Sequence, residues 1–137
     1  MTIVRWMVVA AGAVLLAGCS SRSVPAGDVA TAPTSLLEAN ELLHAAVGPG
    51  GRPPARLADL DRHKAIFPRG YEAIKTGEIV VVWGGKPKGE GEVGKGEAVL
   101  AYEKAAPTDG GYVVLSAGTI KKMTAAEFNA APKAGKN

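Results

Sequence analysis

A glycine-rich loop is the first place where the residue types and their spacing could do chemistry. Residues 89–95 read Gly-x-x-x-x-Gly-Lys, and residues 89–94 also read Gly-x-Gly-x-x-Gly. Both patterns cradle phosphates on backbone N–H groups where a helix begins. Here Gly96 stands where a Ser or Thr would bind Mg²⁺, and a strand is expected from Ala98. Nearby carboxylates would also repel a phosphate, so we expect a solvated hairpin loop and no nucleotide cofactor; these carboxylates are Glu90, Glu92 and Glu97.

The two histidines are the next candidates, for metal binding or catalysis. His44 follows Glu41 by three positions and Asn40 by four, so the three side chains share one face of an expected helix. His63 lies among charged residues in an expected surface turn. A metal site needs three or four converging ligands, and no spacing here supplies them. Because no Ser-His-Asp, Cys-His or Gly-x-Ser-x-Gly arrangement is present either, we expect no metal, no catalytic residue and no enzymatic activity.

Three aromatic residues fall on neighbouring expected strands: Trp83, Tyr102 and Tyr112. One possibility is an exposed aromatic patch for a ligand or partner. The other is a set of cross-strand pairs inside the core. Core packing is favoured, because a chain that is only 5% aromatic has few such residues to fill its interior.

The N-terminus has the pattern of an export signal. Arg5 precedes an uncharged apolar run over residues 6–17, which is too short to span a bilayer. The run ends in Leu16-Ala17-Gly18-Cys19, which resembles the lipobox of bacterial lipoproteins. The resemblance implies that the Cys19 thiol is acylated and that cleavage before Cys19 removes residues 1–18. An ordinary signal peptide with a chance Cys, or a short membrane anchor, is the alternative.

Composition limits the remaining classes. A chain of 137 residues allows one small domain, and a single Cys excludes an internal disulfide framework. Removal of Arg5 with the signal leaves 15 basic and 13 acidic residues. This near-balance argues against nucleic-acid binding, which needs a strongly basic face.

The mature chain divides into a lipidated flexible tether over 19–34, a domain over 35–130 and a frayed tail over 131–137. Apolar residues at helical spacing predict an amphipathic helix over 36–47, with Ser35 and Glu38 as a capping box. A shorter helical piece is expected from Pro53 to about His63. Then come a loop over 67–70 and one helical turn over 71–75.

From residue 78 the apolar period changes to that of strands. Strands are expected over 79–83, 98–103, 112–116 and 119–123, and Thr124 with Glu127 forms a capping box for a short C-terminal helix. Helices first and adjacent strands later predict an α+β fold in which the N-terminal helix packs on a small antiparallel sheet of three to four strands. We expect Leu43 to meet the sheet face that contains Val81.

The second half resembles the C-terminal sheet of pseudopilin G-like domains of type II secretion. The resemblance is carried by residues 99–104 and by Gly110-Gly111-Tyr112 through Ile120, where an apolar strand ends in a tight turn and returns. Ala117 stands where those domains often have Asp, and the lipobox replaces their long hydrophobic N-terminal helix. The resemblance therefore implies a fold and no function.

Two function classes remain open. The first is a membrane-anchored envelope lipoprotein with a non-catalytic interaction or structural domain, held on membrane lipid through Cys19 and contacting an envelope protein. The alternative is a small periplasmic ligand-binding or enzymatic domain with a pocket that the sequence does not reveal. Ser20 after the Cys favours the periplasmic face of the outer membrane if the cell has two membranes.

Overall fold

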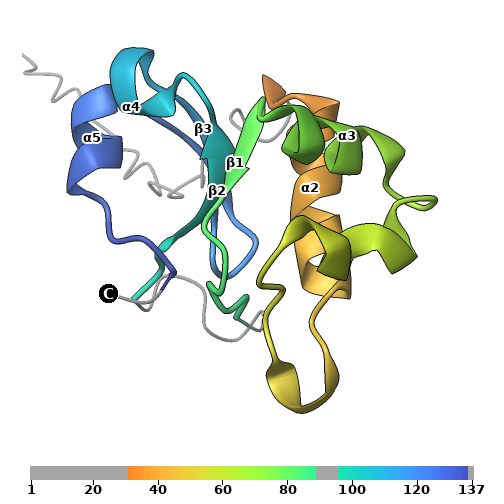
Figure 1. Ribbon diagram of the computed structural model, residues 1–137. Coiled ribbons are helices and arrows are strands. Elements are labelled where there is room, and N and C mark those ends of the chain that lie inside the picture. Colours follow the sequence, from red (N-terminus) through yellow and green to blue (C-terminus); the bar gives the residue numbers. More distant parts are fainter. Residues whose placement is uncertain (1–30, 89–95, 136–137) are drawn as a thin grey trace, which may run out of the picture.

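The computed structural model describes residues 31–88 and 96–135 and confirms the α+β class. Four strands form one antiparallel sheet, with helical elements before, between and after them (Figure 1). No helix in the part of the chain that is described has the length and apolar character needed to cross a membrane. The elements in chain order are α2 (Thr34–Ala45), η1 (Pro49–Gly51), η2 (Leu57–His63), α3 (Pro68–Thr76), β1 (Ile79–Val81), β2 (Val99–Glu103), α4 (Ala106–Asp109), β3 (Gly111–Leu115), β4 (Ile120–Met123) and α5 (Ala125–Ala130).

The sheet is a meander in the order β1-β2-β3-β4, close to the predicted strands. Val80 pairs with Tyr102, and Tyr112 pairs with Lys122. β1 ends at Val81, two residues earlier than expected, because the chain turns at residues 83 and 84. Gly118, with φ +85°, forms the tight turn between β3 and β4, a conformation that favours glycine.

One face of the sheet is covered by α2 and α3, as Figure 1 shows. Leu43 is 1% exposed and lies in one core cluster with Val81, which is 8% exposed. Ile79 from the same strand face joins them. The prediction that Leu43 packs on this face of the sheet is therefore confirmed.

The other face is covered by α4 and α5. Phe128 of α5 packs against Tyr102, with ring centroids 4.6 Å apart. The expected capping box at Thr124 is present, because its side chain accepts from the Glu127 N–H while the Glu127 carboxylate accepts from the Thr124 N–H. α4, a single turn between β2 and β3, was not predicted from the sequence.

The start of α2 corrects the sequence analysis. The residue before the helix is Pro33, with no side-chain cap, so Ser35 does not cap it. Glu38 instead accepts hydrogen bonds from the N–H groups of Arg69 and Gly70, at 2.7 and 3.0 Å. These bonds satisfy the first turn of α3, which begins at Pro68 inside the expected loop. A helix replaces the loop because Glu38 supplies a cap from another element.

The segment before η2 also differs from expectation. Residues 53–56 are not helical, and the 3-10 helix begins only at Leu57. The Asp59 carboxylate accepts the Ala55 N–H at 2.9 Å, which holds the chain extended up to that point. The extended backbone of Arg56, with φ −163° and ψ 164°, precedes the helix.

The folded domain extends further than predicted at both of its ends. Thr31 and Tyr112 share a hydrogen bond of 2.6 Å between their hydroxyls, so the last residues assigned to the tether contact the domain. Residues 131–135 are not frayed. Lys133 forms a parallel bridge with Val99, and its ammonium donates to the carbonyl oxygens of Phe128 and Ala131. Sheet pairing and these bonds order a segment whose composition alone predicted fraying.

Candidate functional site

Two candidates from the sequence lie outside the described residues: the lipobox ending in Cys19, and the glycine-rich loop over 89–95. After that loop the chain continues into β2, a strand, as the sequence analysis expected. Next to the loop, Lys88 donates from its ammonium to the Gly96 carbonyl at 3.1 Å.

The histidines lie apart, on α2 and η2. His44 is half-buried below the turn between β3 and β4, and a Cβ built on Gly118 would stand 3.5 Å from its Nε2 atom. Asn40 donates to the Gly118 carbonyl at 3.4 Å, whereas Glu41 is exposed. Within residues 31–88 and 96–135, no three His, Cys, Asp or Glu side chains converge as a metal site would require.

Core packing, the favoured alternative, holds for two of the three aromatic residues, because Tyr102 and Tyr112 pack against the two core clusters, whereas Trp83 does not. Tyr102 and Tyr112 are half-buried, on β2 and β3. Trp83 is 36% exposed and is one of two large hydrophobic residues that the described surface exposes. The reason is the early end of β1, which places Trp83 in a turn instead of the sheet.

The structure contains a further site that was not predicted from the sequence. An open groove of about 520 Å³ lies between the C-terminal end of α2, the following loop, η2 and the turn after β1. We call it the arginine groove. Its charged lining residues are Arg52, Arg56, Arg62 and Asp59, and its apolar lining includes Pro49, Pro53 and Pro54.

Backbone hydrogen bonds fix the loop that forms one wall of the arginine groove. The Gly48 N–H donates to the Arg52 carbonyl at 2.8 Å, which closes a tight turn around η1. Gly50 and Gly51 both have φ +71°, so this turn depends on glycine. On the other wall, the Gly84 N–H donates to the Pro54 carbonyl at 3.1 Å and joins the loop to the turn that carries Trp83. The groove is therefore preformed.

The three guanidinium groups of the groove differ in their partners. Arg56 is paired with Asp59, at 3.5 Å between Nε and Oδ1. The backbone N–H of Ala55, together with Arg56, holds the pKa of Asp59 below its usual range, so this carboxylate stays ionised. Arg52 and Arg62 are exposed, and neither guanidinium has a hydrogen bond or an ion pair within the described part of the chain.

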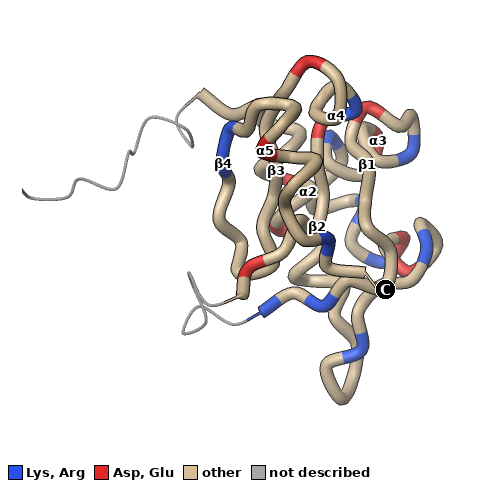
Figure 2. The backbone as a smooth tube through the Cα atoms, turned by 90° about the vertical axis from the view of Figure 1, so that its left-hand side faces the viewer, with Lys and Arg blue, Asp and Glu red and all other residues tan. Residues whose placement is uncertain are grey.

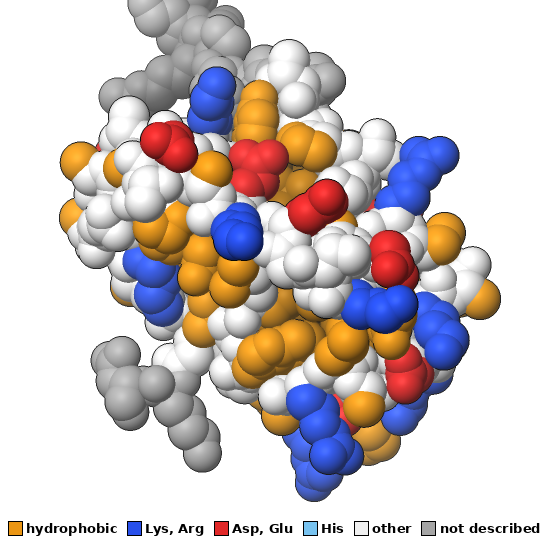
Figure 3. All heavy atoms as spheres, turned by 45° about the horizontal axis from the view of Figure 1, so that its top comes forward, with side chains coloured by type: hydrophobic (Ala, Val, Ile, Leu, Met, Phe, Trp, Pro, Cys, Tyr) orange, Lys and Arg blue, Asp and Glu red, His pale blue; other side chains and the backbone are white. Residues whose placement is uncertain are grey.

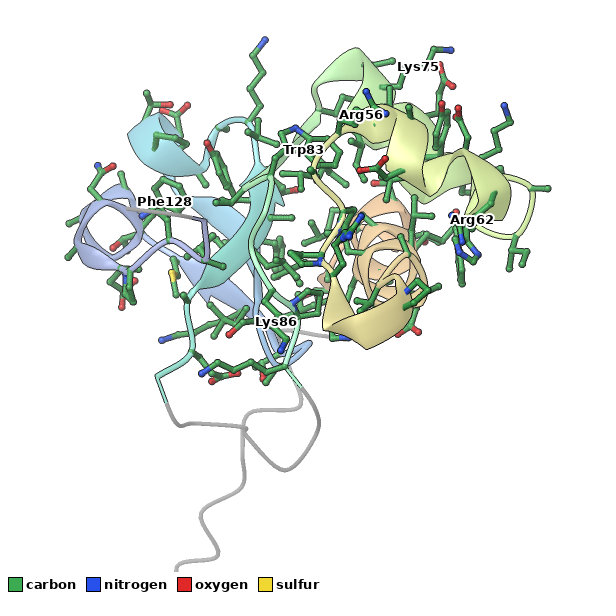
Figure 4. All side chains as sticks on the ribbon, turned by 60° about the horizontal axis from the view of Figure 1, so that its bottom comes forward. Arg56, Arg62, Lys75, Trp83, Lys86 and Phe128 are labelled. Atoms are coloured by element: carbon green, nitrogen blue, oxygen red, sulfur yellow. The ribbon has the colours of Figure 1, made fainter. Side chains whose placement is uncertain are left out.

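A further cation lies beside this loop. The Lys86 ammonium is 3.6 Å from the position that a Cβ on Gly51 would take. In Figure 2, Lys and Arg positions lie at the lower end of the backbone and also along β4 and near α3 and α4. Figure 4 labels Arg56 and Arg62 on the segment leading into and through η2, with Trp83 on the side of the strands and Lys86 towards the lower end. Several cations therefore lie near this loop, while others, among them Lys121 and Lys122 of β4, lie elsewhere on the domain.

Two other depressions have a different character. One, of about 440 Å³, lies beside the start of α2 and is lined in part by Glu78, Glu103 and Lys104. Another, of about 550 Å³, is lined in part by Glu103, Asp109 and Glu127. Figure 3 shows the face at the top of Figure 1, where acidic, basic and hydrophobic side chains are interspersed. Carboxylates outnumber cations in the lining of both depressions, which disfavours an anion, whereas arginines outnumber the one carboxylate of the arginine groove.

Comparisons with known proteins return no match to a family model, a curated protein or a solved structure. One signal for the arginine groove is present in the sequence: three arginines between positions 52 and 62, within a segment rich in Pro and Gly.

Proposed function

We propose that this protein is a membrane-anchored envelope lipoprotein whose domain is a non-catalytic interaction module, and that the arginine groove is its binding surface. The observation that carries the proposal is a preformed groove bordered by two guanidinium groups without partners, Arg52 and Arg62. Because these guanidinium groups have no protein partner to give up, they can form strong charge-assisted hydrogen bonds with an anionic partner.

The anchoring part of the proposal rests on the lipobox residues that end in Cys19. Acyl chains on that residue would hold the protein at a membrane, since each buried CH₂ contributes about 0.8 kcal/mol. Twelve residue steps separate Cys19 from Thr31, where the described domain begins. Fully extended, this segment reaches at most about 40 Å, which keeps the domain close to the bilayer.

The direction in which the groove faces supports the interaction role. The chain enters the domain beside the N-terminal end of α2, at the top of Figure 1, and the arginine groove lies at the C-terminal end of the same helix. At about 1.5 Å per residue the length of α2 separates the two by about 17 Å. The groove therefore lies on the side of the domain remote from its attachment point, where other envelope components can reach it.

The lining of the groove favours binding over catalysis. Guanidinium groups stay protonated at all physiological pH values, and proline rings offer no proton to transfer. The one carboxylate of the groove, Asp59, is held ionised by Ala55 and Arg56, which makes it a weak base. These side chains can hold and orient a partner.

The test combines anchoring with contact in cells. Mass spectrometry of the mature N-terminus is expected to find acylated Cys19, and Cys19→Ser to leave an uncleaved precursor. A photocrosslinking amino acid at the exposed groove position Ala55 is expected to give discrete adducts with envelope proteins, and the same group at exposed Ala126 on α5 to give none of them. An unmodified Cys19, or identical adducts from both positions, would refute the proposal.

A further inference from the structure

The partner class follows from the charges and shape of the arginine groove. Resting on the proposed function, we infer that the groove binds an acidic polypeptide segment of a second protein, whose carboxylates bond to Arg52 and Arg62. The planar fork of a guanidinium matches a carboxylate with two parallel N–H···O bonds. Both forks are exposed and free of partners in the described chain, so they are ready to make these bonds.

Asp59 determines how the anionic groups of the partner must be spaced. It lines the groove together with the arginines and already pairs with Arg56. The Asp59–Arg56 pair has no net charge, so a polyanion with a charge at every short step would place one of its charges where the groove offers no free cation. A polypeptide in which acidic residues are separated by apolar ones avoids that placement. This spacing favours an acidic peptide over a nucleic acid or a polyphosphate.

The uncharged part of the groove also fits a polypeptide. Its lining includes three prolines, Pro49, Pro53 and Pro54, whose rings give a rigid apolar surface between the charged groups. The exposed Trp83 lies next to Gly84, which lines the groove. Arg and Trp are, with Tyr, the side chains enriched at hot spots of protein–protein interfaces, where a few anchors dominate affinity. Such anchors beside a preformed apolar surface are typical of a protein-binding site.

The position of the groove disfavours the membrane as its anionic ligand. The chain enters at the opposite end of α2, where the neighbouring depression is lined by Glu78 and Glu103. In this depression an anionic headgroup would meet two carboxylates and one ammonium, that of Lys104. The free arginines face the other way.

Tryptophan fluorescence gives a readout local to the site. Trp6 belongs to the segment removed before Cys19, so Trp83 is the only tryptophan of the mature chain. The experiment titrates purified mature protein in nonionic detergent with an acetylated peptide of Glu-Ala repeats. We expect a saturable change in Trp83 emission that weakens as NaCl is added, because the ion pairs are exposed.

The variant Arg52→Ala/Arg62→Ala is expected to weaken peptide binding by roughly tenfold or more. Its matched control is Arg69→Ala/Lys121→Ala, which removes the same charge at two exposed positions outside the groove and should change the affinity less than roughly twofold. Because neither groove arginine has a partner, the melting temperature of the test variant should equal that of the parent, so any loss of binding is not a loss of folding.

Several outcomes would overturn the inference. Equal loss of affinity in both double variants would show non-specific charge attraction, as would equal binding of a Lys-Ala peptide. A response to vesicles containing phosphatidylglycerol, without one to the acidic peptide, would assign the groove to lipid. If the peptide fails while crosslinks from position 55 persist in cells, the inference is wrong and the proposed function stands.

Discussion

Truncation of Leu43 tests whether α2 belongs to the core that holds the groove. Leu43→Ala removes a side chain that is 1% exposed and clustered with Val81 and Leu100 of the sheet. The lost transfer free energy is about 2 kcal/mol, at about 0.8 kcal/mol per buried CH₂. The cavity left between helix and sheet brings the expected loss in the free energy of unfolding to about 2–5 kcal/mol. That is a large share of the roughly 5–15 kcal/mol available to a small domain.

The assay is thermal unfolding of the purified protein, followed by circular dichroism. Each kcal/mol shifts the melting temperature of a domain of about 100 residues by about 4–8 °C, so Leu43→Ala should lower it by about 10 °C or more. Glu41→Ala on the same helix is the control, because Glu41 is exposed and should change the melting temperature little. Coincident melting curves for Leu43→Ala and the parent would refute the packing of α2 on the sheet.

Three further perturbations test other parts of the structure. Gly70→Ala places a Cβ 2.5 Å from the Ala39 backbone N and should destabilise the protein by about 1–3 kcal/mol in chemical unfolding. Gly48→Ala, whose Cβ would have no neighbour closer than 3.7 Å apart from the adjacent residues, should be tolerated, and equal effects of the two variants would contradict the close approach of α2 and α3. Hydrogen bonds from Thr124 lower the pKa of Glu127 in the folded state, so the stabilisation by Glu127 is present above its unfolded-state pKa and is lost as the pH falls through its folded-state pKa. Glu127→Gln should therefore flatten the acid dependence of the melting temperature, and an unchanged profile would contradict the capping box. ATP and NAD should cause no thermal shift, and a reproducible shift that disappears in Lys95→Ala would show that the glycine-rich loop binds a nucleotide.

The sheet was predictable because its signals are local. β-branched runs separated by glycine turns define the strands, and alternation along Ile79–Val81 correctly chose the face that meets Leu43. The capping box at Thr124 was also predictable, because both of its members lie within one turn of chain. Each of these features depends only on residues close in sequence.

The corrected features depend on residues distant in sequence. Glu38 looked like the partner of Ser35, but it caps α3 at Arg69 and Gly70, more than thirty residues further along. The prediction of a frayed tail was wrong for the same reason, since backbone hydrogen bonds join Val99 to Pro132 and Ala134 and order residues that would otherwise fray. Local composition does not contain either partner.

The arginine groove was not predicted because it depends on which charged side chains pair with one another in the folded protein. The sequence contains Arg52, Arg56 and Arg62 but does not reveal that Asp59 pairs with Arg56 and leaves the other two free. Nor does it reveal that the turn after Trp83 bonds to Pro54 and forms the opposite wall. Only the folded loop distinguishes a binding guanidinium from one that pairs with a neighbouring carboxylate.

Stability and binding are therefore separable in this domain, although α2 links them. The helix buries Leu43 against the sheet, and Ala46, the residue that follows the helix, lines the groove, so Leu43→Ala should weaken binding only by unfolding the protein. Arg52 and Arg62 contribute charge to the groove and no contact to the core, so their removal should weaken binding at unchanged stability. At a temperature where Leu43→Ala remains folded, its affinity for the acidic peptide should match the parent. A loss of affinity there would mean that core packing shapes the groove directly.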